Sequence, residues 1–558
     1  MHRIVFIVIG LLSICYPNIP DAVGENGVVV SSNDYATQVG IDALKAGGNA
    51  VDAAVAVGFA LSVVHPSAGN LGGGGFMVMR FSDGRVTTID FREMAPSLSD
   101  KDMFLDENLE IVPDKSLKTA LASGVPGSVA GLGYAHEKYG SMKWNRLVKP
   151  SIKLASKGYK LSYKDMFYLN NYRDFLSLDE ESKKIFSQKD GQYELGDVFI
   201  QQDLANTLVR ISNNGYREFY EGITADNIVR CMKRTNGIIS KQDLMNYHVV
   251  EREPIEFTYK DYKIYSMPPP SSGGICLAQI LNQLELIDVS QFGQHSSDHI
   301  HFMVEAERRA YADRAHYLGD PDFVDVPMSH LISKGYAEQR SSNIDPFLAS
   351  ESENITYGNI NPESEETTHY SVVDKWGNAV SVTTTINRAY GNGIVVDDSG
   401  FLLNNEMDDF SSKPGEPNSF GLIGNTANAI EPGKRMLSSM TPTIVTDNED
   451  QLFLVLGSPG GSTIITTVAQ LIVNVIDYEM NISDAVEMGR FHHQWLPDLI
   501  QYEPSTISDD TGKELFKRGY SLHPRMSIGE ANCIQYNKNL KLYFGAADSR
   551  RGASAIGY

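Results

Sequence analysis

A short β-hairpin predicted between Thr367 and Thr385 constrains this chain more than any other feature. Segments 368–373 and 379–385 are rich in Val and Thr, which favour strands, and the residues between them have turn composition. If the strands pair symmetrically about Trp376, Thr367 lies opposite Thr385, because each is nine positions away. A β-bulge would shift that register. The hairpin therefore predicts two hydroxyl groups side by side at the ends of neighbouring strands.

Composition excludes some classes of partner and sets the scale of the fold. The chain has 558 residues, with 70 acidic and 48 basic ones, for a formal net charge of −22. A nucleic-acid partner would require a basic face, so we expect none. No Pro/Gly/Ser-rich tract or long charge run interrupts the middle of the chain. We therefore expect one densely connected globule rather than the several domains that length alone suggests.

The first residues have the pattern of a signal peptide. His2 and Arg3 precede an apolar run of eleven residues, Ile4–Ile14, which is too short to span a bilayer. We assign residues 1–22 to this signal and expect no membrane anchor after its removal. Three cysteines then remain, far apart in the chain, and they indicate neither a disulfide framework nor a metal site: Cys231, Cys276 and Cys533. Export with so few cysteines suits a bacterial periplasmic or secreted protein.

Strand-rich segments bracket a largely helical middle. We predict a helical stretch over 34–63, a strand over Val86–Phe91 that delivers Arg92 at its end, and mostly helices over 117–340, including Asp298–Tyr317. Strands dominate again at 367–373, 379–385, 400–404, 443–446 and 452–456, and a helix follows over 463–478. The polar segment 350–366 is expected to be an exposed loop. The pattern predicts an α+β fold of stacked sheets with helices outside.

Two glycine clusters call for a structural explanation. Residues 72–75 are four consecutive glycines, which require unusual φ/ψ angles or a close approach of backbones. Gly460 and Gly461 lie in a loop between a predicted strand and a predicted helix, where their N–H groups can converge on an oxyanion. Neither cluster is followed by the Lys of a phosphate-binding loop, so packing and oxyanion binding are the favoured roles. The adjacent His492 and His493 diverge on a helix and do not indicate a metal site.

Several long motifs, in a consistent order, identify the family that the chain resembles. The segment from Glu366 to Asp374 resembles the processing site of γ-glutamyltranspeptidases, also called glutathione hydrolases, which are N-terminal-nucleophile hydrolases. The resemblance extends from about Gly27 to Tyr558. It also includes the segments 40–52, 65–76, 90–96, 402–410, 437–443 and 457–462. This resemblance implies a four-layer αββα sandwich.

The resemblance implies that the chain cuts itself between Glu366 and Thr367. The Thr367 hydroxyl would attack the Glu366 carbonyl, and water would release the resulting ester. The products would be a large subunit, residues 23–366, and a small subunit, residues 367–558, held together without covalent bonds. A threonine hydroxyl requires a base, and the newly exposed α-amine of Thr367, with a reference pKa of about 7.7–8.0, can supply it.

The motifs also contain a complete set of groups for binding a γ-glutamyl substrate. Thr385 can orient the Thr367 hydroxyl, and Gly460 and Gly461 can hold the oxyanion. The α-carboxylate of the substrate would be bound by Arg92, whose guanidinium can form a bidentate pair, and by the hydroxyls of Ser438 and Ser439. The α-ammonium would be bound by three acceptors: Asn387, Glu406 and Asp409. No metal or organic cofactor is implied.

The expected activity is that of a self-processing γ-glutamyltransferase and glutathione hydrolase. Its substrates would be glutathione and other γ-glutamyl compounds, with water or an amino-acid or dipeptide amine as acceptor. Segment 411–428 resembles a flap over the site, and Phe420 occupies a position where some relatives have Tyr, so a closing hydrogen bond to Asn387 would be absent. Two alternatives remain at this point. One is an acylase or poly-γ-glutamate hydrolase on the same machinery, and the other is an inactive secreted binding protein.

Overall fold

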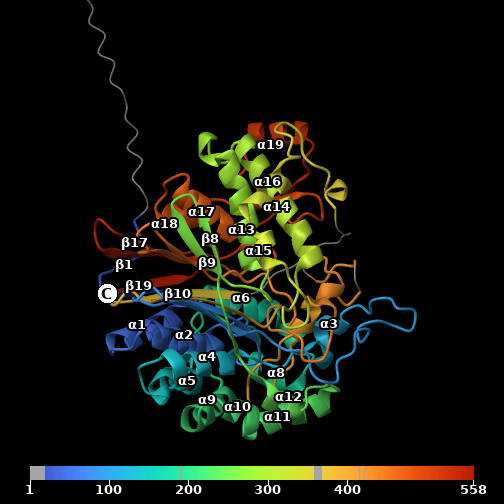
Figure 1. Ribbon diagram of the computed structural model, residues 1–558. Helices are drawn as coiled ribbons and strands as arrows, with labels where there is room; N and C mark the ends of the chain where they lie inside the picture. The colour runs from blue at the N-terminus through green and yellow to red at the C-terminus, as the bar shows by residue number, and fades with distance from the viewer. Residues whose placement is uncertain (1–18, 189–190, 357–366, 414, 420) are drawn as a thin grey trace, which may run out of the picture.

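Two seven-stranded antiparallel sheets lie face to face at the centre of the computed structural model (Figure 1). The structure describes residues 19–188, 191–356, 367–413, 415–419 and 421–558. The predicted signal segment up to residue 18, Glu366 and Phe420 lie outside the described residues. Among the described residues, no helix combines the length and the apolar character needed to cross a membrane.

The first sheet combines strands from both ends of the chain. Its order is β1 (Ala22–Gly24), β18 (Leu542–Ala547), β17 (Asn532–Asn537), β13 (Leu452–Leu456), β12 (Thr443–Thr446), β9 (Tyr262–Ser266) and β8 (Ile255–Tyr259). The second sheet has the order β19 (Ser554–Gly557), β2 (Gly27–Ser31), β10 (Thr368–Asp374), β11 (Ala379–Thr385), β3 (Gly74–Arg80), β4 (Val86–Phe91) and β7 (Val250–Arg252). The predicted hairpin therefore forms the middle of the second sheet.

Helices cover the outer face of each sheet (Figure 1). The second sheet packs on α1 (Asp34–Lys45), α2 (Ala50–Val64) and α4 (Ser128–Tyr139), with α5 (Trp144–Lys157) and α9 (Gln202–Asn214) beyond them. The first sheet packs on α13 (Gly273–Ile287), α14 (Ser297–Tyr317), α17 (Thr463–Ile476) and α18 (Ile482–Glu487). The order of layers is helix, sheet, sheet, helix, which confirms the αββα sandwich.

Shorter elements complete the described chain. The helices are α3 (Lys115–Lys118), α6 (Tyr163–Asn171), α7 (Arg173–Leu176), α8 (Glu180–Phe186), α10 (Glu218–Glu221), α11 (Ile223–Thr235), α12 (Lys241–Asn246), α15 (Met328–Leu331), α16 (Lys334–Ser341) and α19 (Asp509–Lys517). Two small sheets are formed by β14 (Phe491–His492), β15 (Ile500–Tyr502) and β16 (Leu522–Pro524), and by β5 (Tyr159–Lys160) with β6 (Val198–Phe199).

Side chains of the central strands alternate between two hydrophobic cores. In β10, Tyr370 and Val372 pack among the helices, whereas Val373 lies in the core between the two sheets. Ser371, on the same face as Val373, donates to the carbonyl oxygen of Asn532 in the first sheet at 2.8 Å. Because side chains alternate along a strand, the odd-numbered positions of β10 face the first sheet. The strand is buried on both faces, as a central strand of a four-layer fold must be.

The register of the hairpin is the symmetric one predicted from the sequence. Thr368 pairs with Thr384 and His369 with Thr383, and this pattern continues to the turn without a bulge. In the turn, the carboxylate of the buried Asp374 accepts the backbone N–H groups of Trp376 at 2.9 Å and Asn378 at 3.0 Å. It also accepts the N–H of Ala50, the first residue of α2, at 2.9 Å. One side chain thus ties the turn to the helical layer.

Several predicted boundaries are corrected by the structure. The stretch 34–63 is two helices, because α1 ends at Lys45 and a capping box of Asn49 and Asp52 starts α2. Segment 400–404 is not a strand and forms only isolated bridges through Leu402 and Leu403. The middle of the chain contains β7, β8 and β9 between 250 and 266, which the helical prediction missed. The strand Val86–Phe91 has the predicted bounds.

Replacing Asp374 with Ala should lower the free energy of unfolding by about 2–4 kcal/mol, because several N–H groups lose a buried acceptor. The matched control is Asp83→Ala in the neighbouring β3–β4 turn, where the carboxylate is exposed and binds only its local partner Arg85. Urea unfolding of both variants measures the difference. Equal, small losses in the two variants would show that Asp374 does not support the hairpin.

Candidate active site

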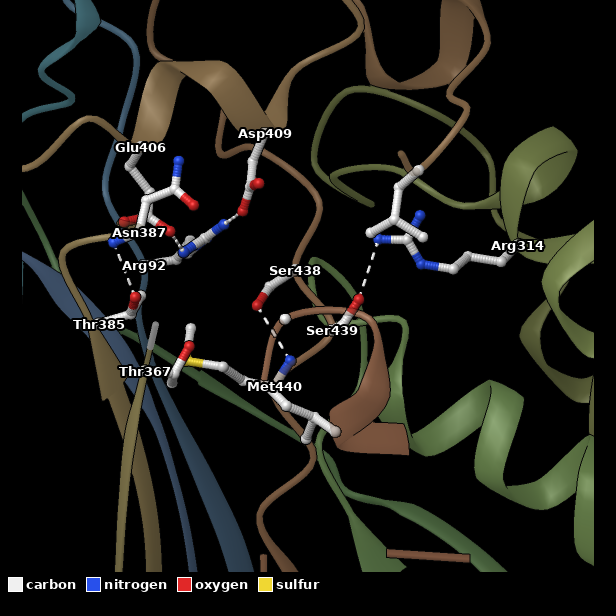
Figure 2. A pocket seen from close by; sticks show the side chains of 13 residues that line it. Arg92, Arg314, Thr367, Thr385, Asn387, Glu406, Asp409, Ser438, Ser439 and Met440 are labelled. Atoms are coloured by element: carbon white, nitrogen blue, oxygen red, sulfur yellow. Dashed lines mark hydrogen bonds and ion pairs between the residues drawn. The ribbon is translucent and has the colours of Figure 1, made fainter. Parts of the chain in front are cut away.

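Two threonines stand at the same edge of the second sheet. Thr367 directly precedes β10 and Thr385 ends β11, each one residue beyond the pair formed by Thr368 and Thr384. Both have odd numbers, so both belong to the face turned toward the first sheet. Figure 2 shows the two side chains pointing into one pocket, and both residues are largely buried. The predicted juxtaposition of two hydroxyl-bearing residues is thus present in the fold.

The ends of neighbouring strands bring the remaining predicted residues to this pocket. Arg92 follows β4, which is two strands away from β11 in the same sheet. On the first sheet, Ser438 and Ser439 precede β12, and the glycine loop follows β13, whose last residue pairs with the first residue of β12. The pocket is lined by Arg92, Arg314, Thr367, Thr385, Asn387, Glu406, Asp409, Leu422, Ser438, Ser439, Met440, Gly461 and Ile464.

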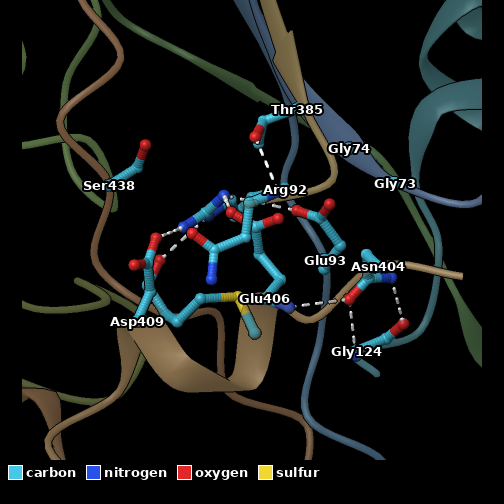
Figure 3. Close-up of polar contacts among 12 residues, drawn as sticks. Gly73, Gly74, Arg92, Glu93, Gly124, Thr385, Asn404, Glu406, Asp409 and Ser438 are labelled. Atoms are coloured by element: carbon cyan, nitrogen blue, oxygen red, sulfur yellow. Dashed lines mark hydrogen bonds and ion pairs between the residues drawn. The ribbon is translucent and has the colours of Figure 1, made fainter. Parts of the chain in front are cut away.

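The guanidinium of Arg92 is buried and lies among three carboxylates (Figure 3). Nη1 is paired with the Glu406 carboxylate, and Nη2 with Oδ2 of Asp409 at 2.5 Å. Glu93 is more distant, with Oε2 3.5 Å from Nη1. The predicted carboxylate-binding Arg and the predicted ammonium-binding acids therefore contact one another directly.

This cluster contains more negative groups than its single cation can neutralise. Burial opposes the charge on Arg92, but the attraction of Glu406, Glu93 and Asp409 outweighs it and raises the pKa of the guanidinium. Burial raises the pKa of Glu93 to about 7 against the opposing effect of Arg92. Burial also raises the pKa of Glu406 and of Asp409, again opposed by Arg92. The cluster therefore favours bound protons, and a ligand that brings its own cation can replace them.

Asn387 offers an acceptor at the rim of this cluster. It has a φ of 71°, a left-handed conformation that Asn tolerates better than most residues. Its Nδ2 donates to the carbonyl oxygen of Asn405 at 2.9 Å, and its backbone N–H donates to Thr385 Oγ1 at 2.8 Å. Among the described residues, Oδ1 of Asn387 and Oε2 of Glu406 are buried without a hydrogen-bond partner. Both atoms are suited to accept from an ammonium group.

The two serines are held by different neighbours. Ser438 Oγ accepts the backbone N–H of Met440 at 3.1 Å, and Ser439 Oγ accepts from Nη2 of Arg314 at 3.2 Å (Figure 2). The Nε of Arg314 also donates to Ser272 Oγ at 2.9 Å. Arg314 thus places a second guanidinium beside the pocket, on the side away from Arg92.

The glycine loop adopts the backbone conformations that only glycine accepts easily. Gly460 has a φ of 135° and Gly461 a φ of 55°. Gly461 lines the pocket, and the carbonyl oxygen of Gly460 accepts the N–H of Thr463 at 3.0 Å, at the start of α17. The N-terminus of α17 carries the positive end of its dipole. The loop therefore presents a favourable environment for a developing negative charge.

Segment 411–428 lies against the same cluster of acids. Asn418 Nδ2 donates to Asp409 Oδ1 at 3.2 Å, and the N–H of Ser419 donates to Asp408 Oδ2 at 3.1 Å. Leu422 lines the pocket. This location agrees with the predicted flap, and the prediction about Phe420 remains outside the described residues.

Sequence reasoning missed several residues of the pocket. Arg314 is part of the predicted helix 298–317, but no local motif distinguishes it from other charged positions of that helix. Met440 lies inside the segment 437–443 and Ile464 two residues beyond the segment 457–462, and both have the composition of ordinary core residues. Glu93, in the segment 90–96, contacts Arg92 rather than lining the pocket, and only its burial in the structure reveals its altered pKa. One pocket is lined by Thr367, Thr385, Arg92, Asn387, Glu406, Asp409, Ser438, Ser439 and Gly461. Gly460 precedes Gly461 in the chain and is not among the lining residues.

The four-layer αββα architecture is that of the N-terminal-nucleophile hydrolases. The model of the γ-glutamyltranspeptidase family matches residues 36–558. A glutathione hydrolase proenzyme from Escherichia coli (strain K12) is 51% identical over 528 residues, covering 94% of this chain and 90% of the relative. Another from Pseudomonas sp. (strain A14) is 45% identical over 546 residues, covering 96% and 94%. The chain belongs to the γ-glutamyltranspeptidase family.

Solved structures agree with the fold. A cephalosporin acylase from Bacillus halodurans has a TM-score of 0.84 at 25% identity, covering 99% of both chains. The γ-glutamyltranspeptidase of Helicobacter pylori has a TM-score of 0.58 at 45% identity, covering 61% of this chain and 97% of that one. The latter match covers a part of the chain because that structure contains a shorter polypeptide.

The acid cluster predicts a pH dependence of ligand binding. The negative charge of the acid cluster favours an ammonium-bearing ligand, and the raised pKa of Glu93, about 7, means that protons remove part of that charge below that pH. The affinity for L-glutamate should therefore fall by up to about tenfold per pH unit below 7 and level off above it. Glutarate, which lacks the ammonium, should not show this loss. Calorimetric titration from pH 5 to 8 measures both.

Glu93→Gln is the matched variant for this titration, since it keeps the size of the side chain and removes its proton equilibrium. Its pH profile for L-glutamate should lose the transition near 7. An unchanged midpoint in this variant would mean that Glu93 does not set the dependence.

Proposed function

We propose that this chain is a self-processing γ-glutamyltransferase and glutathione hydrolase whose nucleophile is Thr367. The observation that carries the proposal is the position of Thr367. It directly precedes the central strand β10 and lines one pocket with Arg92, Glu406 and Asp409 (Figure 2). Gly461 of the glycine loop lines the same pocket. Membership of the γ-glutamyltranspeptidase family and the name of the relatives, glutathione hydrolase proenzyme, support the same activity.

Maturation follows from the same hydroxyl. Oγ of Thr367 attacks the carbonyl carbon of Glu366, the C–N bond between the two residues breaks, and the nitrogen becomes the free α-amine of Thr367. Water then hydrolyses the ester and leaves Glu366 with a carboxylate. The free α-amine can afterwards accept the proton of the Thr367 hydroxyl. It thus serves as the base that this nucleophile requires.

The sheets explain how the proposed subunits 23–366 and 367–558 stay together. In the second sheet, β10 pairs with β2 and β11 pairs with β3, so the hairpin of the small subunit lies between strands of the large one. In the first sheet, β12 of the small subunit pairs with β9 of the large one. Cutting one peptide bond beside β10 leaves all of these ladders intact.

Catalysis would use the pocket in two steps. The α-carboxylate of the donor is bound by Arg92, Ser438 and Ser439, and its α-ammonium by Asn387, Glu406 and Asp409. Thr367 attacks the γ-carbonyl while Thr385 orients it, and the N–H groups of Gly460 and Gly461 stabilise the oxyanion. The departing amine takes the proton that Thr367 Oγ gave to the α-amine. Water or an amino-acid or dipeptide amine then attacks the γ-glutamyl ester, and its proton returns to the Thr367 oxygen as the ester bond breaks.

The amino-terminal pattern supports export by the signal peptide at 1–22, to a bacterial periplasm or to the medium. Glutathione and other γ-glutamyl compounds would then be met outside the cytoplasm.

Purified protein should separate on a denaturing gel into two fragments, and the smaller should begin at Thr367. Thr367→Ala should remain a single chain, because it lacks the attacking hydroxyl, whereas Thr367→Ser should still be cut, more slowly. Amino-terminal sequencing of the smaller fragment identifies the bond. A different first residue, or cutting of Thr367→Ala at an unchanged rate, would contradict the proposal.

A second candidate activity is the removal of a glutaryl side chain, which the likeness to the cephalosporin acylase suggests. A glutaryl group lacks the α-ammonium for which the acid cluster supplies acceptors. We therefore expect kcat/KM for a γ-glutamyl anilide to exceed that for the glutaryl anilide by at least about 100-fold, since unpaired buried acceptors are costly. Preference for the glutaryl anilide would favour the acylase activity instead.

A further inference from the structure

A buried polar network lies directly behind the glycine loop. It joins Ser462 and Thr466, at the start of α17, to His492 and Gln494 at the end of β14, and all four side chains are buried. Gln494 Oε1 accepts the Ser462 hydroxyl at 2.7 Å and lies 2.9 Å from His492 Nε2. His492 Nδ1 lies 2.8 Å from Thr466 Oγ1. Ser462 and Thr466, at the start of α17, are therefore both linked to the segment 492–494.

The chemistry of these groups determines where the protons are. Burial lowers the pKa of His492 to about 3, so its imidazole is neutral. Gln494 Oε1 can only accept, so His492 Nε2 carries the hydrogen and donates to it. His492 Nδ1, then without a hydrogen, is an acceptor 2.8 Å from Thr466 Oγ1, whose hydroxyl also lies 3.1 Å from the carbonyl oxygen of Thr463. The neutral imidazole thus holds the amide of Gln494 in one orientation, with its oxygen toward Ser462.

The other end of the same amide approaches the flap. With Oε1 directed at Ser462, Nε2 of Gln494 lies 3.4 Å from the carbonyl oxygen of Gly421 and 3.3 Å from that of Leu496. Gly421 is next to Leu422, which lines the pocket. Ser462 is next to Gly461, and its own carbonyl oxygen accepts the hydroxyl of the buried Tyr311. One side chain therefore contacts the neighbours of both the glycine loop and the flap.

We propose that Gln494, oriented by His492, is a positioning residue that sets the glycine loop for oxyanion binding and couples that loop to the flap. It acts through Ser462 and Gly421 and does not itself line the pocket. The inference rests on the proposed function, because the role of Gly460 and Gly461 belongs to it. Since the groups that bind the α-carboxylate and the α-ammonium lie elsewhere, Gln494 should affect the transition state more than the bound substrate.

The test is Gln494→Met, which keeps the length of the side chain and removes its polar atoms. For a γ-glutamyl anilide, kcat should fall by about 10- to 100-fold, since small displacements of a catalytic loop have effects of this order. KM should change by less than about threefold. A boronate analogue of the γ-glutamyl group, which forms a tetrahedral adduct, should lose affinity in parallel with kcat, whereas L-glutamate should bind as before.

Gln470→Met is the matched control. Gln470 is another buried amide between α17 and the same segment: it donates to the carbonyl oxygens of Thr466 at 3.0 Å and Phe491 at 2.7 Å. It lies further along α17 and touches neither Ser462 nor the flap residues named above. Gln470→Met should lower thermal stability to a similar extent and leave kcat within about twofold of the parent.

Gln494→Glu supplies a second, independent readout. A protonated carboxyl group keeps an acceptor for Ser462 and a donor for the carbonyl side, whereas an ionised one has no donor for Gly421 or Leu496. Burial should raise the pKa of this carboxyl group, so the kcat of the variant relative to the parent should be highest at acidic pH and fall as pH rises. If the amide had only a structural role, the kcat of the variant relative to the parent would not fall with rising pH while KM stayed the same.

The outcomes separate the inference from the proposed function. An inactive parent enzyme, toward every γ-glutamyl donor, would overturn the proposed function. An active parent with equal kcat in Gln494→Met and Gln470→Met, or a flat pH ratio for Gln494→Glu, would overturn the role of Gln494 alone. If Gln494→Met fails to fold, the test is the kcat of Gln494→Glu relative to the parent as a function of pH. A ratio that is highest at acidic pH supports the role of Gln494, and a flat ratio contradicts it.

Discussion

The pairing of β10 with β11 is the constraint on which the rest of the site depends. Their symmetric register brings Thr367 and Thr385 to one edge of the sheet and turns both toward the opposite sheet. A slip of one residue would turn these side chains into the helical layer, away from Arg92 and the glycine loop. Because β10 and β11 are also paired with β2 and β3, this register is supported from both sides. The reactive edge is thus a property of the whole sheet.

The electrostatics of the pocket show why it suits an amino-acid-like group. One buried guanidinium faces three carboxylates, and burial raises the pKa of each of these acids. A ligand that carries both an ammonium and a carboxylate can pair with both kinds of group at once. A ligand with only a negative charge would bring no cation for the acids. A ligand with only a positive charge would bring no carboxylate for Arg92, which would stay paired with its acids. The arrangement therefore favours a zwitterionic end group over either single charge.

Local residue patterns were sufficient to predict the hairpin and the position of Arg92 from the sequence. The alternating Val/Thr strands and the turn around Trp376 gave the hairpin and its register, and the strand ending at Phe91 delivered Arg92 as expected. Long-range contacts were not predictable in this way. The loop at 400–404 has strand-like composition but forms only isolated bridges, and Arg314 reaches the pocket through the packing of α14, which no local pattern reveals.

The raised pKa values of the acids around Arg92 and the polar network behind the glycine loop were not predicted either. The pKa of Glu93 depends on burial and on neighbours more than 300 residues away, such as Glu406. His492 and His493 were predicted to diverge on a helix, whereas His492 ends a strand, β14, and takes part in the network through its neutral ring. Such features depend on how distant segments meet, and they become visible only once the layers are assembled.

The most direct measurement is mass spectrometry of the small fragment after brief mixing with a γ-glutamyl anilide and acid quenching. The account predicts a γ-glutamyl ester on the fragment, located by peptide mapping at its first residue, Thr367. An adduct on any other residue, or turnover without a covalent adduct under conditions in which deacylation is slow, would contradict it.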